Sequence, residues 1–329
     1  MGKPRAFNIV LSLLLLYFGA TAASIHPPLP ADVTMNKEAG HGGCLIVKAT
    51  LESGEELPFL VDTGTPLTLL DKSLAPRLGE RLASLAFSML KSGKQKCGVY
   101  AAPKLYMGNV PLMTGRRVVT YDFKRLSARA GCDIKGILGM DCLGHYCIQL
   151  DFEAGKMRFL DANYLDPAGL GKRYPIQPAT NTIFRGIPLI QSAGLLAGTV
   201  TNTVIDTGNT GDSLVQGKAI RQHAAGSYSG GLIKRIKHFL AVKGVVNRDV
   251  ALPGCVWEGN TYTNIAVGRG SGDLPNWLGL RFLARHLVTL DFPKRMLYLK
   301  QTSIGPLNMG GRTWSNTAGA NRRCPFSFE

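Results

Sequence analysis

The sequence has few acidic residues, and this shortage sets the charge of the whole chain. Aspartate and glutamate together number 22, against 38 lysines and arginines, so the formal net charge is +16. The chain therefore lacks the acidic surface typical of enzymes that work in strong acid, and it favours attraction to anionic surfaces or substrates. The densest basic group, in residues 231–243, is mixed with apolar residues and carries no nucleic-acid-binding motif, so we expect no nucleic-acid partner.

Long apolar runs are also scarce. One run, residues 7–20, follows Lys3 and Arg5 and precedes the small residues of 20–23. This order predicts a secretory signal peptide over residues 1–23, and a secreted or periplasmic protein without stable membrane insertion after cleavage. The alternative is a membrane anchor, for which the run is short against a span of about 20 residues. Residues 24–329 contain no Asn-x-Ser/Thr sequon, which fits a bacterial exporter slightly better than a eukaryotic one.

Cysteines are few and odd in number, and they limit the possible bridges and metal sites. The seven cysteines are Cys44, Cys97, Cys132, Cys142, Cys147, Cys255 and Cys324. Export permits disulfides, and bridges, if they form, are expected between residues 44 and 147, with at least one thiol left over. His145 lies between Cys142 and Cys147, but this spacing lacks the paired pattern of zinc ligands. We therefore expect structural or disulfide-bonded cysteines there and no metal.

Aromatic residues make up only 8% of the chain, whereas glycines number 39, which favours short strands and tight turns. Residues 44–62 alternate between apolar and polar side chains and then become apolar, with a turn at Gly54 between the two arms, as in a hairpin. Residues 104–112 contain a Gly-Asn turn between two short strands. Residues 69–85 could hold a short helix, which Pro76 interrupts. The sequence thus predicts a mainly β protein with few short helices.

An internal repeat organises these elements into two halves. The segment "LVDTG" (60–64) recurs as "VIDTG" (204–208), and residues 137–160 recur as 277–300. Each half is expected to run from strands through an Asp-Thr-Gly turn to an apolar-apolar-Gly segment, a short helix and a strand ending in "LDF". We place the halves at residues 24–165 and 166–301, followed by a loop-like tail at 302–329. Asp151 and Asp291, which end these matching strands, are predicted to be turn residues.

The repeat gives each half one aspartate after an apolar strand, Asp62 and Asp206. Two similar lobes related by a pseudo-two-fold axis would bring these side chains together. Two neighbouring carboxylates cannot both ionise cheaply, so they share one proton. One carboxylate can then act as a base towards water, while the other donates a proton to the substrate. This chemistry needs no metal or organic cofactor.

The two motifs, "LVDTGT" and "VIDTGN", and the segments "GILG" and "NWLG" resemble those of aspartic proteases of the pepsin and retropepsin kind. The resemblance covers roughly residues 44–300. It implies a bilobal, pepsin-like β fold that hydrolyses peptide or protein substrates, here expected as a monomer. It also implies that Asp62 and Asp206 form the catalytic dyad. The residues it implies as supports of the dyad are Thr63, Gly64, Thr65, Thr207, Gly208 and Asn209.

The chain departs from this family in three places. Asn209 stands where Ser or Thr usually follows the second Asp-Thr-Gly motif, and its amide could donate a hydrogen bond to a carboxylate. The flap region, residues 87–103 with a predicted turn at 92–94, places Tyr100 on the returning arm, from which it would not reach the dyad. Only about twenty residues separate the predicted cleavage point from the first strand, which is short for a pepsin-type pro-segment. Asn209 and the missing flap tyrosine leave one alternative, a catalytically weak or inactive protease-fold binding or inhibitor protein. The positive net charge leaves another, an exported β-rich module that binds anionic cell-surface material.

Overall fold

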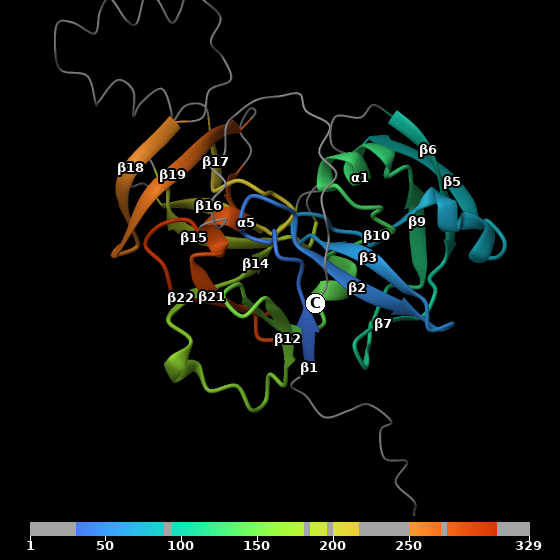
Figure 1. Ribbon diagram of the computed structural model, residues 1–329, viewed down its shortest axis with the longest axis horizontal. Helices are drawn as coiled ribbons and strands as arrows, with labels where there is room; N and C mark the ends of the chain where they lie inside the picture. The colour runs from blue at the N-terminus through green and yellow to red at the C-terminus, as the bar shows by residue number, and fades with distance from the viewer. Residues whose placement is uncertain are drawn as a thin grey trace, which may run out of the picture.

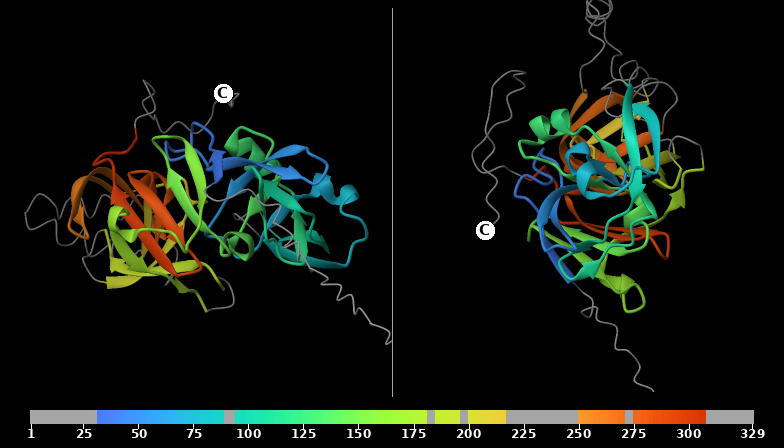
Figure 2. Two further views of the ribbon diagram at one scale, coloured as in Figure 1. Left: turned by 90° about the horizontal axis from the view of Figure 1, so that it is seen from below. Right: turned by 90° about the vertical axis from the view of Figure 1, so that its right-hand side faces the viewer.

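Short strands make up most of the structure, a computed structural model that describes residues 31–88, 94–180, 185–195, 200–216, 250–270 and 275–307. The strands gather into two halves that lie side by side (Figure 1). Seen from below, the first half, coloured blue to green, lies beside the second half, coloured yellow to red (Figure 2). This confirms the predicted mainly β, bilobal architecture. The predicted signal peptide, most of the flap turn, the basic group at 231–243 and the tail beyond 307 lie outside the described residues.

The first half is built on a nine-stranded sheet in the order β5-β6-β9-β4-β10-β3-β2-β7-β8. Its strands are β2 (Ile46–Leu51), β3 (Glu56–Val61), β4 (Leu69–Asp71), β5 (Ala83–Ser88), β6 (Lys94–Ala101), β7 (Leu105–Met107), β8 (Val110–Pro111), β9 (Arg117–Tyr121) and β10 (Gly136–Leu138). Its helices are the 3₁₀ helix η1 (Lys72–Arg77) and the α-helices α1 (Lys124–Ala130) and α2 (Met140–Leu143). The predicted hairpin turns are confirmed at Gly54 and Gly108, whose φ angles of 86° and 56° suit glycine.

The second half repeats this plan in a seven-stranded sheet of order β14-β15-β16-β20-β17-β19-β18. Its elements are β14 (Gln177–Pro178), β15 (Pro188–Ala193), β16 (Val200–Asp206), β17 (Ser213–Gln216), β18 (Val250–Trp257), β19 (Asn260–Gly270), β20 (Asn276–Gly279) and the helix α5 (Leu280–Leu283). The short helices α2 and α5 follow the two Leu-Gly pairs, as the repeat predicts.

A six-stranded sheet of order β1-β12-β11-β21-β22-β13 joins the halves. Its strands are β1 (Ala31–Thr34), β11 (Cys147–Asp151), β12 (Lys156–Leu160), β13 (Lys172–Pro175), β21 (His286–Asp291) and β22 (Met296–Gln301), with the 3₁₀ helix η2 (Pro167–Gly169) before β13. At its centre β11 pairs antiparallel with β21, and the Gln149 side chain donates a hydrogen bond to Thr289 over 3.0 Å. Asp151 and Asp291 end these two strands and accept backbone N–H groups three residues on, which confirms their prediction as turn residues.

In each half, one strand lies between the strand that precedes the Asp-Thr-Gly motif and the strand that follows it. In the first half β10 pairs parallel with β3 and antiparallel with β4. In the second half β20 pairs parallel with β16 and antiparallel with β17. The inserted strands end in Leu138 and Gly279, so each apolar-apolar-Gly segment lies directly beside the strand that leads to an aspartate.

One apolar core extends through both halves. It contains Val61 and Leu138 of the first half together with Ile205 and Leu278 of the second. A second cluster, here called the α1 cluster, lies in the first half and includes Ile46, Leu60, Leu126 and Ile137. Because the larger core is shared, the two halves are expected to stabilise each other. Each helix in the described ranges is too short or too polar to span a bilayer.

Four of the cysteines take no part in a disulfide, and for Cys142 and Cys147 this decides between the two expected roles, structural or disulfide-bonded, in favour of the structural one. Cys44, Cys142, Cys147 and Cys255 are free thiols. Cys142 and Cys147 are buried in α2 and at the start of β11, and burial raises the pKa of each thiol to about 12. They act as small apolar residues of the core rather than as reactive groups.

Candidate active site

The two aspartates predicted as a pair lie together between the halves. Asp62 follows β3 directly, and Asp206 is the last residue of β16. Their carboxyl groups are hydrogen-bonded to each other. A Cβ atom built on Gly64 would lie 2.3 Å from Oδ1 of Asp206, and one on Gly208 would lie 2.4 Å from Oδ1 of Asp62. Each aspartate therefore contacts the glycine of the other motif, where no larger residue fits.

The two threonines of the motifs form a reciprocal hydrogen-bond lattice beneath the carboxyl groups. The Thr63 N–H donates to Oγ1 of Thr207 over 3.0 Å, and the Thr207 N–H donates to Oγ1 of Thr63 over 3.1 Å. Each hydroxyl then donates to a backbone carbonyl of the opposite half, at Ile205 over 2.6 Å and at Val61 over 2.8 Å. Both threonines are fully buried, so these bonds are protected from water and fix the relative position of the two loops.

Backbone N–H groups hold each carboxyl group in the same way in both halves. The Gly64 N–H donates to Asp62 over 2.8 Å, and the Gly208 N–H donates to Asp206 over 2.9 Å. These bonds favour the ionised form of the carboxyl groups. The Asn209 N–H donates to the main-chain carbonyl of Asp206 over 3.3 Å.

Burial works in the opposite direction and dominates at both aspartates. Removal from water raises the pKa of Asp62 above its usual range. At Asp206 burial and the neighbouring Asp62 charge together raise the pKa well above its usual range. The pair therefore keeps a proton at pH values where two isolated aspartates would both be ionised. A shared proton of this kind allows one group to accept a proton while the other donates one.

The loop of the first motif is supported by a hydroxyl. The Gly139 N–H donates to Oγ1 of Thr68 over 3.2 Å, and this hydroxyl donates to Asp141 over 2.7 Å. These bonds tie the end of β10 to the segment that follows Asp62.

The loop of the second motif is supported by a buried ion pair that our sequence analysis missed. The Gly279 N–H donates to the Asp212 carbonyl over 2.9 Å. The Asp212 carboxylate lies 3.1 Å from Nη1 of Arg281 and 3.0 Å from Nη2 of Arg285. Asp212 and Arg285 are fully buried. The repeat could have indicated that Asp212 supports the loop, because Asp212 lies six residues after Asp206 and Thr68 lies six residues after Asp62.

Thr65 and Asn209, expected to support the carboxylates through their side chains, have other contacts. Oδ1 of Asn209 accepts the Gly211 N–H over 3.1 Å, and its Nδ2 is buried without a hydrogen-bond partner among the described residues. Asn209 thus reaches Asp206 only through its backbone. Thr65 donates its N–H to the Asp62 carbonyl over 3.4 Å, a main-chain contact rather than a bond from its hydroxyl to the carboxylate.

Tyr100 belongs to the apolar core. It belongs to β6, pairs with Val118 of β9 and is only 9% exposed. Its ring fills the space beside Gly98, where an added Cβ would lie 2.5 Å away. This agrees with the expectation that Tyr100 does not act as a flap tyrosine.

Comparison with known families points in the same direction as the geometry. A family model described as aspartyl protease matches residues 47–142, which contain the first Asp-Thr-Gly motif and the β10 segment beside it. This match supports an aspartic protease family and hydrolase activity for the chain. No curated protein matches the chain. Across the residues that the structure describes, no three His, Cys, Asp or Glu side chains are grouped so that they could hold a metal ion.

Proposed function

We propose that the protein is an exported aspartic endopeptidase that hydrolyses peptide bonds with a water activated by Asp62 and Asp206. The observation that carries the proposal is the hydrogen-bonded carboxyl pair above the reciprocal Thr63 and Thr207 lattice, with one member from each half. The aspartyl protease match over residues 47–142 supports the same reaction class.

In the proposed mechanism the pair enters the reaction with one proton. The ionised carboxylate takes a proton from a water molecule, whose oxygen attacks the carbonyl carbon of the scissile peptide bond. The protonated carboxyl donates its proton to the carbonyl oxygen, which gives a tetrahedral gem-diol. Transfer of a proton to the amide nitrogen then lets the C–N bond break. Gly64 and Gly208 leave room for the pair, and their N–H groups hold the carboxyl groups in position.

The test is cleavage of unfolded casein by the purified protein between pH 3 and pH 7, with and without a pepstatin-like transition-state mimic. We expect inhibition by the mimic and loss of cleavage in both Asp62→Asn and Asp206→Asn. Asp166→Asn, a change at an exposed residue just before η2, is the matched control and should keep full activity. Cleavage that survives Asp62→Asn would overturn the proposal.

Export is part of the proposal and has its own test. The motivation is the charged, apolar and small-residue order of residues 1–23. Expression in a bacterium with an export pathway should yield a mature protein that begins at Ser24, as read by N-terminal sequencing. An unprocessed chain that stays with the cytoplasmic fraction would contradict export without affecting the catalytic proposal.

A second candidate is a protease-fold binding or inhibitor protein that no longer turns over substrate. The buried Nδ2 of Asn209 and the core position of Tyr100 favour it, because both depart from the family pattern. This candidate predicts that the pepstatin-like mimic binds the protein while casein stays intact over the whole pH range. Dyad-dependent cleavage of casein would exclude it.

A further inference from the structure

Residues 206–212, here called the second motif loop, are bonded to the start of α5. The Leu280 N–H donates to the Asn209 carbonyl over 2.6 Å, and the Gly279 N–H donates to the Asp212 carbonyl over 2.9 Å. The Asn209 N–H in turn donates to the Asp206 carbonyl over 3.3 Å. A shift of Asp212 would therefore move the loop that carries Asp206.

The Asp212 carboxylate fixes the end of the second motif loop to two other elements. It accepts the Ala266 N–H of β19 over 2.8 Å. It also lies 3.1 Å from Nη1 of Arg281 in α5 and 3.0 Å from Nη2 of Arg285, just after α5. Arg285 donates a further bond to the Asn264 carbonyl of β19 over 3.3 Å. The loop, β19 and the α5 segment thus meet at one buried carboxylate.

The stability of the fold does not explain this ion pair. Asp212 and Arg285 are 0% exposed, and taking two charges out of water costs about as much as their attraction returns. Nε and Nη1 of Arg285 have no hydrogen-bond partner among the described residues. Burial raises the pKa of the Asp212 carboxyl even though Arg285 and Arg281 act to lower it. A buried pair that adds little stability can instead fix a single conformation of the loop.

The first half supports its own motif loop in a different way, through a hydroxyl. There Oγ1 of Thr68 donates to Asp141 over 2.7 Å. Arg281 occupies the place in the repeat that Asp141 has in the first half, at an offset of 140 residues. The position of Asp62 therefore depends on a hydroxyl and that of Asp206 on an ion pair, so a substitution can displace one aspartate without the other.

We propose that Asp212, held by Arg285 and Arg281, is a positioning residue that fixes Asp206 against Asp62. The consequence for catalysis rests on the proposed proteolytic function. Two carboxyl groups share one proton only within hydrogen-bond reach of each other. Their proximity also separates the two pKa values at which the pair loses its protons, so the singly protonated form persists over a wide pH range. Displacement of Asp206 therefore lowers the rate and narrows that range.

The first variant is Asp212→Asn, which keeps the shape and an acceptor for the Ala266 N–H but loses the charge. Cleavage of a quenched fluorogenic casein peptide is followed between pH 3 and pH 7, at a temperature at which circular dichroism shows the variant folded. We expect kcat to fall about 10- to 100-fold and KM to change by less than about threefold. The bell-shaped pH profile of kcat should also narrow. A smaller folded fraction alone would lower the profile without moving either limb.

A second variant separates positioning from stability. Asp212→Asn leaves Arg285 as a buried cation without its carboxylate, which destabilises the protein. The double variant Asp212→Asn/Arg285→Met removes that cation and keeps most of the side-chain volume, so thermal denaturation should show recovered stability. We expect kcat to stay low and the pH profile to stay narrow. Recovery of kcat together with stability would overturn the inference, as would a wild-type kcat in Asp212→Asn.

The matched control is Asp151→Asn in the six-stranded sheet. The Asp151 carboxylate also accepts one backbone N–H, from Ala154, and pairs with one arginine, Arg158, over 2.9 Å. The same loss of charge at this residue should leave kcat, KM and both limbs of the pH profile unchanged. An equally narrowed profile in this control would attribute the effect to any lost carboxylate and would contradict a specific role of Asp212.

The two proposals fail in different ways, because the pKa values of the pair can be measured without turnover. They are read from the carboxyl ¹³C chemical shifts of protein labelled at its aspartates. If the wild-type chain cleaves no peptide while Asp212→Asn brings the two pKa values of the pair closer together, the catalytic proposal fails and the positioning role stands. If the wild-type chain cleaves peptides and Asp212→Asn changes neither kcat nor these pKa values, the positioning role fails and the catalytic proposal stands.

Discussion

Thr63 and Thr207 matter at the residue scale because each makes bonds that no other side chain of the motif can make. A threonine hydroxyl accepts one hydrogen bond and donates another, and both are used across the junction of the halves. The lattice is fully buried, so a lost hydroxyl would leave backbone groups without partners.

Thr63→Val removes this hydroxyl with almost no change of shape. We expect a loss of about 2–4 kcal/mol in the free energy of unfolding, because the Thr207 N–H and the Ile205 carbonyl lose their partner. Chemical denaturation in an Asp62→Asn background, which prevents self-digestion, measures the loss. Thr63→Ser keeps the hydroxyl and should cost less than about 1 kcal/mol. Equal losses in both variants would contradict this role of the hydroxyl.

Also at the residue scale, His286 makes the free energy of unfolding depend on pH. Its Nε2 lies 2.8 Å from the Tyr262 hydroxyl, and burial lowers its pKa from 6.5 to about 4. The unfolded chain therefore takes up a proton near pH 6.5, whereas the folded chain takes it up only near pH 4. Protons thus favour the unfolded state, and stability falls as the pH decreases through this window.

The expected size of this effect is about 3 kcal/mol, because the pKa of His286 falls from 6.5 to about 4 on folding. His286→Gln can keep a hydrogen bond to Tyr262 but cannot titrate. In an Asp62→Asn background, the loss of unfolding free energy between pH 7 and pH 4 should be smaller in the His286→Gln protein by roughly that amount. The same loss in both proteins would show that His286 is not the titrating group.

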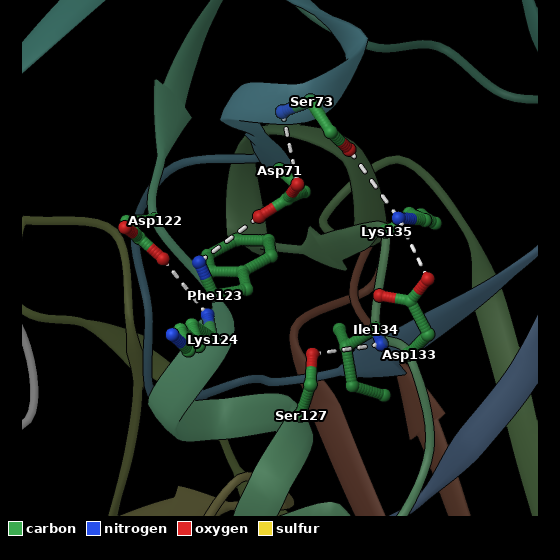
Figure 3. A network of polar contacts seen from close by, with 9 residues as sticks. All are labelled: Asp71, Ser73, Asp122, Phe123, Lys124, Ser127, Asp133, Ile134 and Lys135. Atoms are coloured by element: carbon green, nitrogen blue, oxygen red, sulfur yellow. Dashed lines mark hydrogen bonds and ion pairs between the residues drawn. The ribbon is translucent and has the colours of Figure 1, made fainter.

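At the element scale, Asp71 connects the two helices η1 and α1 (Figure 3). Its carboxylate accepts the Ser73 N–H over 2.9 Å at the start of η1 and the Phe123 N–H over 3.0 Å at the start of α1. The predicted helix interrupted by Pro76 is this six-residue 3₁₀ helix. The helix α1 was not predicted from the sequence, because seven residues are too few to form a stable helix alone. The helix depends on the packing of Leu126 against strands distant in sequence.

Asp71→Ala should therefore destabilise the protein by about 2–3 kcal/mol, because it removes a helix cap and leaves a buried N–H unpaired. Asp122→Ala removes a similar bond to the Lys124 N–H, but the Asp122 side chain is 30% exposed. Water can replace that bond, so the loss should stay below about 1 kcal/mol. Thermal denaturation of the two variants compares them, and a larger loss for Asp122→Ala would contradict this order.

At the scale of the whole molecule, the six-stranded sheet and the shared core make the two halves depend on each other. Leu290 of β21 pairs with Ile148 of β11 and is 1% exposed in the core that extends through both halves. A cavity at this position would loosen contacts on both sides. Stability is therefore expected to be distributed across the junction rather than confined to one half.

Leu290→Ala should cost about 2–5 kcal/mol in unfolding free energy. Amide hydrogen exchange should become faster in β2 and β3 of the first half as well as in β21. Leu287→Ala, on the same strand but only partly buried, is the matched control and should have a smaller effect. Unchanged exchange in β2 and β3 would mean that the halves are independent.

The sequence by itself determined the repeated plan of the molecule. The two Asp-Thr-Gly motifs, the Leu-Gly segments, the hairpin around Gly54 and the strand-end turns at Asp151 and Asp291 are local patterns, so strand periodicity and turn chemistry reveal them. The tertiary structure alone decided how Asn209 bonds, where α1 lies and that Asp212 pairs with Arg285. Each of these depends on contacts between residues far apart in the chain, whose geometry is set by packing and burial rather than by local propensity.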